Sequence, residues 1–355
     1  MRRMHNHGNP IEPVRCIPNA SVADLIENFG RTCFEARNIA DGAKLLEKMI
    51  NEGDTIWLGV AGAGPAGGLG GYIIDLIEKG FIDAICSTGA QVYHDGHFAF
   101  GLPVVQGNPH VDDNALRKSG DVRIYDIRIR ENETLIAQDE LFREFIRNLV
   151  NSGNLPKVRS TADYNHYWGK WVNENAPHPE KSWVAAATKY NVPIFLDSES
   201  NHSIGMNNAA IYLETGIDVS LNASLSLLQG AAILYTNPQT SFFELGGGGP
   251  KNWIQTLAPM LSQILGKEFK GAKRGIQITT APEFDGGLSG CTFSEAVSWG
   301  KYEKANEGLV QIHAEYSAVF PILAQYVFNS CKERKHSEIY TRIPKTLFDL
   351  RSLLV

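Results

Sequence analysis

Three features are scarce in this 355-residue sequence: paired cysteines, long apolar runs and an excess of positive charge. Its five cysteines stand at irregular spacings without a CxxC pair, which argues against a disulfide framework and a zinc cluster. No stretch approaches the roughly 18 apolar residues of a membrane span, and no apolar export signal follows the basic N-terminus. The net charge of −6 favours neither nucleic acid nor an anionic membrane as a partner. We therefore expect a cytoplasmic protein that acts on small molecules or on an exposed protein side chain.

The first twenty residues differ in pattern from the rest of the chain. Residues 1–20 carry three prolines and no periodic apolar pattern, so we interpret them as an arm that lies on the surface or on another subunit. Ser21 and Asp24 then predict the capped start of a helix, and apolar residues continue at helical spacing as far as Ile50. We expect residues 21–355 to form one catalytic domain.

Short apolar runs predict the strands of a sheet. The run at residues 55–60 is followed by a glycine loop, a helical segment at residues 72–78 and a second run at residues 82–86, which together make a βαβ unit. Further runs lie at residues 192–195, 231–234, 242–245, 276–279 and 309–312. Several precede glycine or polar residues and then a helical segment. This alternation predicts an α/β fold with a Rossmann-like, doubly wound, mainly parallel sheet and helices on both faces.

A more polar stretch interrupts this alternation. We interpret residues 108–167 as an insertion with a helix near residues 139–149. Its apolar content is too thin for a core of its own, so we do not expect a separate domain.

Residues 62–67 read GAGPAG, which matches GxGxxG between a strand and a helix. Backbone N–H groups in such a loop can hold a phosphate. The ordinary dinucleotide fingerprint also has an acid at the end of the second strand, whereas Ser87 and Thr88 stand there and Asp83 lies at the other end. A tight turn that lets a helix pack closely is an equally good interpretation.

Two later loops are also rich in glycine. Four glycines at residues 246–249 follow a predicted strand, with Pro250 suited to the first turn of a helix. We favour a phosphate or pyrophosphate site here over a flexible linker, because linkers rarely join a buried strand to an amphipathic helix. In the loop of residues 279–290, Asp285 could bind ribose hydroxyls or stabilise a turn.

The segment of residues 294–301 reads SEAVSWGK and predicts a short helix that begins at Ser294 and ends near Gly300. Glu295 and Trp299 are four residues apart and share one face, where they could form a carboxylate and aromatic wall for an amine. Lys301 would project from the end of this helix, where partial burial favours an uncharged, nucleophilic amine. Taken alone, a lysine after a helix is usually a solvated surface charge.

Together these motifs resemble the deoxyhypusine synthase family. GGGGPKNWI, TTAPEFDGGLSG, EAVSWGK and HAEYSAVFPIL occur in the family's order and spacing, and weaker similarity covers most of residues 50–330. The resemblance implies a Rossmann-like NAD-binding domain and a homotetramer whose active sites are shared between subunits. It also implies that NAD takes a hydride from a polyamine such as spermidine and that Lys301 holds the aminobutyl group as a Schiff base. An acceptor amine then receives the group.

The family pattern assigns roles to individual residues of this sequence. The matching NAD contacts are Gly246, Gly247, Gly248, Thr280, Ala281, Asp285 and Thr88. The matching catalytic residues are Lys301, Glu295 and Trp299, and Ser289 matches on the substrate side. The acceptor that the resemblance implies is either a lysine of a translation initiation factor, as in deoxyhypusine synthase, or putrescine, as in the related homospermidine synthases.

The amine pocket departs from the family pattern. The departures are Asn252 for a histidine, Met206 and Leu288 for acids, Asn201 for an aspartate, and Tyr93 with His94 for paired glutamates. Losing carboxylates at Met206 and Leu288 removes ion pairs with a polyamine, so we expect the donor or acceptor amine to differ from the family's usual pair. His94 could replace one glutamate as an acid or base.

Three other functions stay open. The chain could be a homospermidine synthase, a non-catalytic NAD-binding sensor or a simple dehydrogenase. The joint presence of Glu295, Trp299 and Lys301 counts against the sensor, since a binding module has no use for a buried amine. We expect no metal site, because no compact ligand set fits the spacing of His94, His97, His110 and His202.

Overall fold

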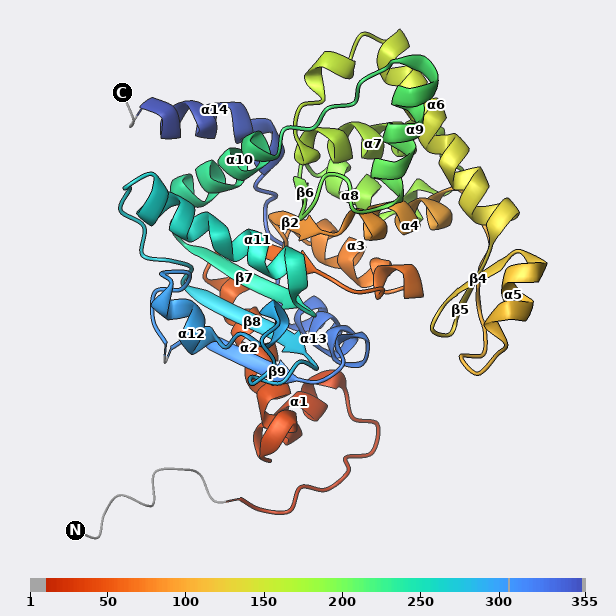
Figure 1. Cartoon of the computed structure of the whole chain (residues 1–355). Coiled ribbons are helices and arrows are strands. Elements are labelled where there is room, and N and C mark those ends of the chain that lie inside the picture. Colours follow the sequence, from red (N-terminus) through yellow and green to blue (C-terminus); the bar gives the residue numbers. More distant parts are fainter. Residues whose placement is uncertain (1–10, 306, 353–355) are drawn as a thin grey trace.

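The computed structural model describes residues 11–305 and 307–352 (Figure 1). Its centre is a six-stranded parallel sheet in the order β6-β2-β1-β7-β8-β9. The strands are β1 (Thr55–Val60), β2 (Ala84–Ser87), β6 (Ile194–Leu196), β7 (Thr240–Leu245), β8 (Arg274–Thr279) and β9 (Leu309–His313). Counted along the chain, the order is third, second, first, fourth, fifth, sixth, as in the dinucleotide-binding Rossmann fold. The predicted α/β fold is confirmed.

Helices cover both faces of this sheet, as predicted. Alternate side chains of β1 point into different cores: Ile56 and Leu58 into one, and Trp57 into the other. The first face carries α2 (Phe34–Asn51), α3 (Gly70–Glu78), α8 (Trp183–Lys189) and α13 (Tyr316–Ser330). The second carries α10 (Ala223–Thr236), α11 (Gly248–Pro259), α12 (Phe293–Ser298) and α14 (Ile339–Ser352).

The remaining long helices are α1 (Val22–Gly30), α4 (Gly89–Ala99), α6 (Ala137–Asn151), α7 (Thr161–Asn175) and α9 (Ser203–Thr215). The predicted cap of α1 is confirmed: the Asp24 N–H donates to Ser21 Oγ at 3.2 Å, and the Ser21 N–H donates to the Asp24 carboxylate at 2.8 Å. Residues 11–20 are exposed and form no helix or strand, and the first ten residues of the predicted arm lie outside the described residues.

The start of the polar insertion and the segment just before it form a second, small sheet. Its antiparallel strands are β3 (Val104–Gln106), β4 (Asp121–Ile124) and β5 (Ile127–Arg130), accompanied by α5 (Asp113–Ser119). Figure 1 shows β4, β5 and α5 apart from the main sheet. Short 3-10 turns occur at Pro65–Gly67, Leu155–Lys157, Pro179–Lys181 and Leu288–Gly290, and π-helical turns at Glu131–Ile136 and Met260–Ile264.

The second half of this insertion packs into the core that it shares with the rest of the chain. The predicted helix near residues 139–149 is present as α6. Phe142 of α6 stacks on Trp168 of α7 with ring centroids 4.1 Å apart, and both are fully buried. Phe145 and Leu149 lie on the same buried face of α6. Apolar residues three and four positions apart gather on one side of a helix, so a segment that is polar on average still buries a stripe.

One predicted strand is wrong. Residues 231–234 lie inside α10, where the Asn222 side chain caps the helix by accepting a hydrogen bond from the Leu225 N–H at 2.9 Å. A short apolar run cannot be assigned to a strand or a buried helix by periodicity alone, and the run's alanines and leucine are strong helix formers.

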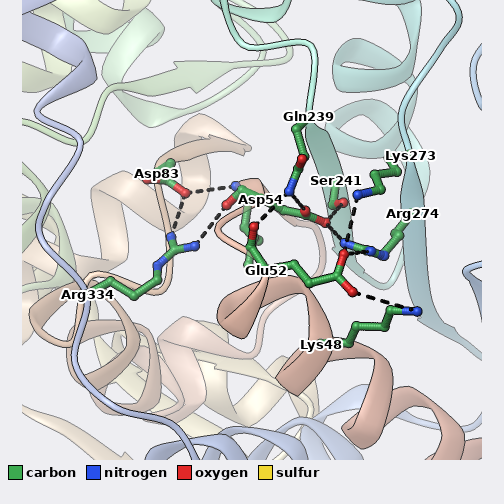
Figure 2. A network of polar contacts seen from close by, with 10 residues as sticks. Lys48, Glu52, Asp54, Asp83, Gln239, Ser241, Lys273, Arg274 and Arg334 are labelled. Carbon is green, nitrogen blue, oxygen red and sulfur yellow. Dashed lines mark hydrogen bonds and ion pairs between the residues drawn. The ribbon is translucent and has the colours of Figure 1, made fainter.

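A buried network of charged side chains joins the amino ends of the central strands (Figure 2). Asp54 lies directly before β1 and accepts hydrogen bonds from Ser241 Oγ of β7 at 2.6 Å and from Arg274 of β8 at 2.5 Å. The same Arg274 guanidinium also reaches Glu52. These contacts lie at the ends of the strands opposite to the ligand side of a parallel sheet, so the network supports the fold rather than a site.

Asp83 extends this support to β2. Its carboxylate accepts a hydrogen bond from the Ile56 N–H at 2.8 Å and pairs with Arg334 at 2.8 Å. This buried acid therefore binds its own chain rather than a ribose.

In the part of the chain that the structure describes, no helix is long and apolar enough to cross a membrane.

Candidate active site

One cavity at the carboxyl ends of the central strands, of about 770 Å³, lies between the loop after β1, the small sheet and the start of α13. Two others hold predicted site residues. The larger of these two, of about 580 Å³, is formed by α11, the loop after β8 and α12. The smaller, of about 310 Å³, is lined by the loops that follow β1, β7, β8 and β9. Strand order reverses between β1 and β7, and ligands of open α/β sheets bind at such a switch point. The two cavities meet at neighbouring residues, because Leu288 lines the larger and Ser289 the smaller.

The larger cavity brings the three predicted catalytic residues together. Lys301, Glu295 and Trp299 all line it. Helix α12 begins at Phe293, one residue before the predicted start, because Thr292 Oγ1 accepts a hydrogen bond from the Glu295 N–H at 3.1 Å. The helix ends before Gly300, whose φ of +71° lies in the left-handed region that favours glycine.

The backbone holds Lys301 in place on both sides. Its N–H donates to the Ala296 carbonyl at 3.1 Å, and its carbonyl accepts a hydrogen bond from the Ala272 N–H at 2.9 Å. The Lys301 side chain is half-buried, and the next residue, Tyr302, is only 1% exposed. The lysine therefore sits at the edge of the core rather than on a freely solvated surface.

Carboxylates outnumber cations around Lys301. Glu283, Asp285 and Glu295 line the same cavity, and Lys301 is the one lysine or arginine among its lining residues. Sequence reasoning registered the acids missing at Met206 and Leu288 but overlooked Glu283, which stands two residues before Asp285 in the same loop. The excess of negative charge favours a cationic ligand such as a protonated amine.

The rim of the larger cavity is apolar and exposed. Phe284 is 92% exposed, Trp299 is 62% exposed and Leu288 is 49% exposed. Asn252, at the position where the resembling family has a histidine, also lines the cavity from α11. The wall opposite α12 therefore offers an amide rather than a titratable ring.

The smaller cavity gathers the predicted cofactor residues around the glycine run. Its lining includes Gly246, Gly247, Gly248, Thr280, Ala281 and Ser289. Gly246 and Gly248 have φ values of +79° and +57°. A Cβ on Gly247 would lie 2.6 Å from Ser289 Oγ, whereas a Cβ on Gly248 would point into open space. The N-terminus of α11 therefore presents a bare backbone, which suits an anion.

Ser289 lies with the glycine run rather than in the amine pocket. Its Oγ accepts a hydrogen bond from the Gly248 N–H at 2.9 Å. Asp285, predicted as a cofactor contact, lines the larger cavity instead. Its carboxylate accepts a hydrogen bond from the Gly287 N–H at 3.1 Å. This hydrogen bond fits the alternative role predicted for Asp285, that of stabilising a turn.

Three predicted residues reach neither cavity within one chain. Thr88 precedes α4, and its buried Oγ1 has no hydrogen-bond partner within the described residues. His94 lies on α4, with its Nδ1 3.0 Å from Nε2 of His97, and burial lowers the pKa of His94 to about 4. Asn201 is exposed ahead of α9. All three belong to the side of the sheet formed by β2 and β6.

A residue that sequence reasoning missed binds one backbone donor of the GxGxxG loop. Tyr316, at the start of α13, accepts a hydrogen bond on its hydroxyl from the Gly64 N–H at 2.7 Å. A Cβ on Gly64 would lie only 2.4 Å from that hydroxyl. The glycine is thus required by close packing, the alternative left open above. The signal in the sequence was a tyrosine directly after Glu315 in the HAEYSAV motif.

Two charged residues flanking the glycine run were also overlooked. Glu244 and Lys251 are 1% and 2% exposed, although each stands in an otherwise apolar or glycine-rich stretch.

Across residues 11–305 and 307–352, no group of three or more His, Cys, Asp and Glu side chains could hold a metal ion.

Comparison with known proteins identifies the family. The family model described as deoxyhypusine synthase matches residues 24–327. A deoxyhypusine synthase-like protein of Nostoc sp. is 34% identical over 97% of this chain and 91% of its own length. A probable deoxyhypusine synthase 2 of Methanosarcina acetivorans is 31% identical over 94% of each chain.

A solved structure shares the fold. It is assigned as a deoxyhypusine synthase from Entamoeba histolytica, with a TM-score of 0.58 and 16% identity over 90% of this chain and 96% of that one. At this identity the likeness concerns the fold alone. The family match and the sequence relatives carry the assignment, and the chain belongs to the deoxyhypusine synthase family.

Proposed function

We propose that this protein is an NAD-dependent transferase that moves an aminobutyl group, or a similar alkylamine, from a polyamine such as spermidine to an acceptor amine through a Schiff base on Lys301. The observation that carries the proposal is the larger cavity, where Lys301 shares one space with Glu283, Asp285 and Glu295. A lysine nucleophile surrounded by carboxylates suits a substrate that is itself a cationic amine.

The smaller cavity supports NAD as the cofactor. The bare N-terminus of α11 at residues 246–248 suits a pyrophosphate, and Thr280 and Ala281 lie beside it. The buried Thr88 Oγ1 without a partner in the described residues is a further polar atom that a ligand could satisfy. NAD, when bound, supplies an acceptor for the hydride that leaves the donor amine and returns it later.

The chain's own residues perform the group transfer. The uncharged amine of Lys301 forms a C=N bond with the oxidised donor carbon, and the departing diamine leaves with the electron pair of the broken C–N bond and a proton. An acceptor amine then forms its own C=N bond to that carbon and releases Lys301. Glu295 and Glu283 neutralise the ammonium groups of the amine, and Trp299 offers an aromatic face to a cation.

Assembly into a homotetramer with shared active sites is part of this proposal. The rim formed by Phe284, Leu288 and Trp299 is too exposed to exclude water from a Schiff base. In addition, Thr88, His94 and Asn201 do not reach Lys301 within one chain. A neighbouring subunit could cover the rim and supply such residues. Light scattering of the purified protein should give a tetramer, and a monomer with full activity would contradict this part.

Trapping the adduct tests the central claim. The protein is incubated with NAD and candidate amines, treated with borohydride and analysed by peptide mass spectrometry. An adduct is expected on Lys301, none in Lys301→Ala, and an unchanged adduct in the matched control Lys304→Ala, because Lys304 is an exposed neighbour outside the cavity. Bound NAD with no adduct from any amine would overturn the proposal.

The acceptor decides between two versions of the function. A homospermidine synthase uses putrescine and needs no protein partner, so product analysis with spermidine and putrescine separates it from modification of a protein lysine. The altered positions Asn252 and Leu288 both line the cavity, which supports a change in amine specificity.

Two other functions make different predictions. A non-catalytic sensor would keep its biological role in Lys301→Ala while binding NAD, and a dehydrogenase would form NADH as a net product.

A further inference from the structure

A buried polar network lies beneath the candidate site and joins the three segments that build it. Glu244, near the carboxyl end of β7, stands in register with Gln277 of β8, and α11 covers both from above. Glu244 is the only glutamate among the buried residues of the described chain. None of these groups lines either cavity, so the network acts on the site only through the residues it holds.

One half of the network anchors the segment that carries Lys301. Glu244 Oε1 accepts a hydrogen bond from Gln255 Nε2 at 2.8 Å and from the Tyr302 hydroxyl at 3.3 Å. Gln255 Nε2 also donates to the Tyr302 hydroxyl at 3.2 Å. Because Tyr302 directly follows Lys301, its fully buried ring fixes the backbone from which the lysine extends.

The other half joins the glycine run to the loop after β8. Lys251 Nζ donates to Gln277 Oε1 at 2.8 Å and to the Cys291 carbonyl at 2.7 Å. Gln277 Nε2 in turn donates to the Gly246 carbonyl at 3.0 Å and to the Ser289 carbonyl at 2.9 Å. One buried ammonium thus ties together residues that line both cavities.

We propose that Glu244 is a positioning residue for Lys301: it holds Tyr302 directly, and its negative charge keeps Lys251 as the ammonium that ties the glycine run to the loop of residues 279–291. The inference rests on the proposed role of Lys301. An isolated buried ammonium is costly, and Glu244 is the buried carboxylate in register with Gln277, the side chain that accepts the Lys251 hydrogen bond, so its charge favours the ammonium form of Lys251.

The charge of Glu244 depends on pH in the neutral range. Burial raises the pKa of Glu244 to about 7, opposed by Lys251, Gln255, Tyr302 and Lys301. Burial lowers the pKa of Lys251, whereas Glu244, Cys291 and Glu295 raise it and Lys301 lowers it further. Glu244 Oε2 has no hydrogen-bond partner within the described residues, which leaves room for a proton there. Below neutral pH the network therefore loses the charge that supports Lys251.

The test is the pH dependence of Lys301 adduct formation. In the unmodified protein the rate should show an inflection near pH 7 in addition to the rise that an uncharged lysine requires. Glu244→Gln should remove that inflection and slow adduct formation at pH 8 on the order of tenfold to a hundredfold, the cost of a misplaced nucleophile. Glu244→Asp, which keeps the carboxylate, should retain the inflection. Adduct formation in the unmodified protein combined with an unchanged profile in Glu244→Gln would overturn the inference.

A control and a second measurement separate positioning from folding. Ser241→Ala, on the same strand but at its other end, should lower stability without changing the pH profile. If Glu244→Gln does not fold, infrared spectra of the unmodified protein with 13C-labelled glutamate should still show a buried carboxyl that titrates near pH 7, distinct from buried Asp95. Absence of that signal would overturn the inference, whereas failure of the unmodified protein to form any adduct would overturn the proposed function instead.

Discussion

The Tyr316 hydroxyl and the Gly64 N–H lie 2.7 Å apart and form a hydrogen bond. This contact uses a backbone donor of the first glycine loop. In the glycine run after β7 the Gly248 N–H donates to Ser289 Oγ, but a Cβ on Gly248 would meet open space. The two glycine-rich loops at the same edge of the sheet thus differ in what binds them: a tyrosine hydroxyl at Gly64, and the smaller Ser289 hydroxyl at the N-terminus of α11. We expect phosphate binding at the second.

Tyr316→Phe tests this division of roles. Removing the hydroxyl leaves the Gly64 N–H without its acceptor, so stability should fall by about 1 kcal/mol. NAD affinity should stay within twofold, about 0.4 kcal/mol, because the loop does not need that donor for phosphate. Chemical denaturation and calorimetric titration with NAD measure the two effects. A large gain in NAD affinity would show instead that Tyr316 competes with the cofactor for the loop.

Arg274→Ala should be one of the most destabilising substitutions away from the candidate site. Asp54 is 1% exposed, and without Arg274 its charge would be buried with only hydroxyl and amide partners from Ser241 and Gln239. Breaking a buried ion pair by removing one partner typically costs about 3–5 kcal/mol. Urea denaturation measures the loss. Arg117→Ala, whose ion pair with Glu131 is exposed, is the control and should change stability by less than about 1 kcal/mol.

Glu283→Gln should weaken the binding of the cationic substrate without abolishing the chemistry. One solvent-accessible ion pair contributes up to about 1 kcal/mol, so the KM for the amine should rise about fivefold while kcat changes little. The KM difference should shrink at high salt, because salt screens exposed charges. Equal KM values at low salt would place the amine elsewhere. Glu303→Gln, an exposed glutamate outside this cavity, provides the control.

The His94 and His97 pair should make the fold sensitive to mild acid. Burial lowers the pKa of His94 to about 4 and that of His97 to about 3, below the ordinary value of 6.5. The unfolded chain therefore binds protons first, so the stability that these rings contribute is present above pH 6.5 and lost as the pH falls towards 4. His94→Gln should reduce the drop in urea midpoint between pH 7 and pH 5. The same substitution at the more exposed His178 should leave that drop unchanged.

Glu244 should have the opposite effect on stability. Its folded-state pKa of about 7 lies above the ordinary 4.5, so the folded chain keeps a proton that the unfolded chain releases. Its contribution is complete below pH 4.5 and is lost as the pH rises to about 7, a change of about 3 kcal/mol. The free energy of unfolding of Glu244→Gln, measured relative to that of the unmodified protein, should therefore increase as the pH rises from 5 to 8. Asp95, whose pKa burial also raises to about 7, contributes the same way, and Asp95→Asn separates the two.

Local sequence patterns determined most of the sheet. The run at residues 55–60 matches β1, and the runs near β2, β6, β7, β8 and β9 fall within a few residues of the observed strands. Buried parallel strands are short apolar runs bounded by glycine or polar residues, so this signal is contained in a few consecutive positions. The capping box at Ser21 and the end of α12 shortly before Gly300 are local for the same reason.

The motif of residues 294–301, together with its resemblance to a family, is enough to single out Lys301 from the sequence. Only the tertiary structure decided what surrounds it: Glu283 joins the cavity, Ser289 belongs to the glycine run, and His94 and Asn201 lie elsewhere in the same chain. Tyr316 against Gly64 and Tyr302 against Glu244 are equally invisible in the sequence, because the partners are separated by 252 and 58 positions. Such contacts depend on how the strands are ordered in the sheet, and no local pattern encodes that order.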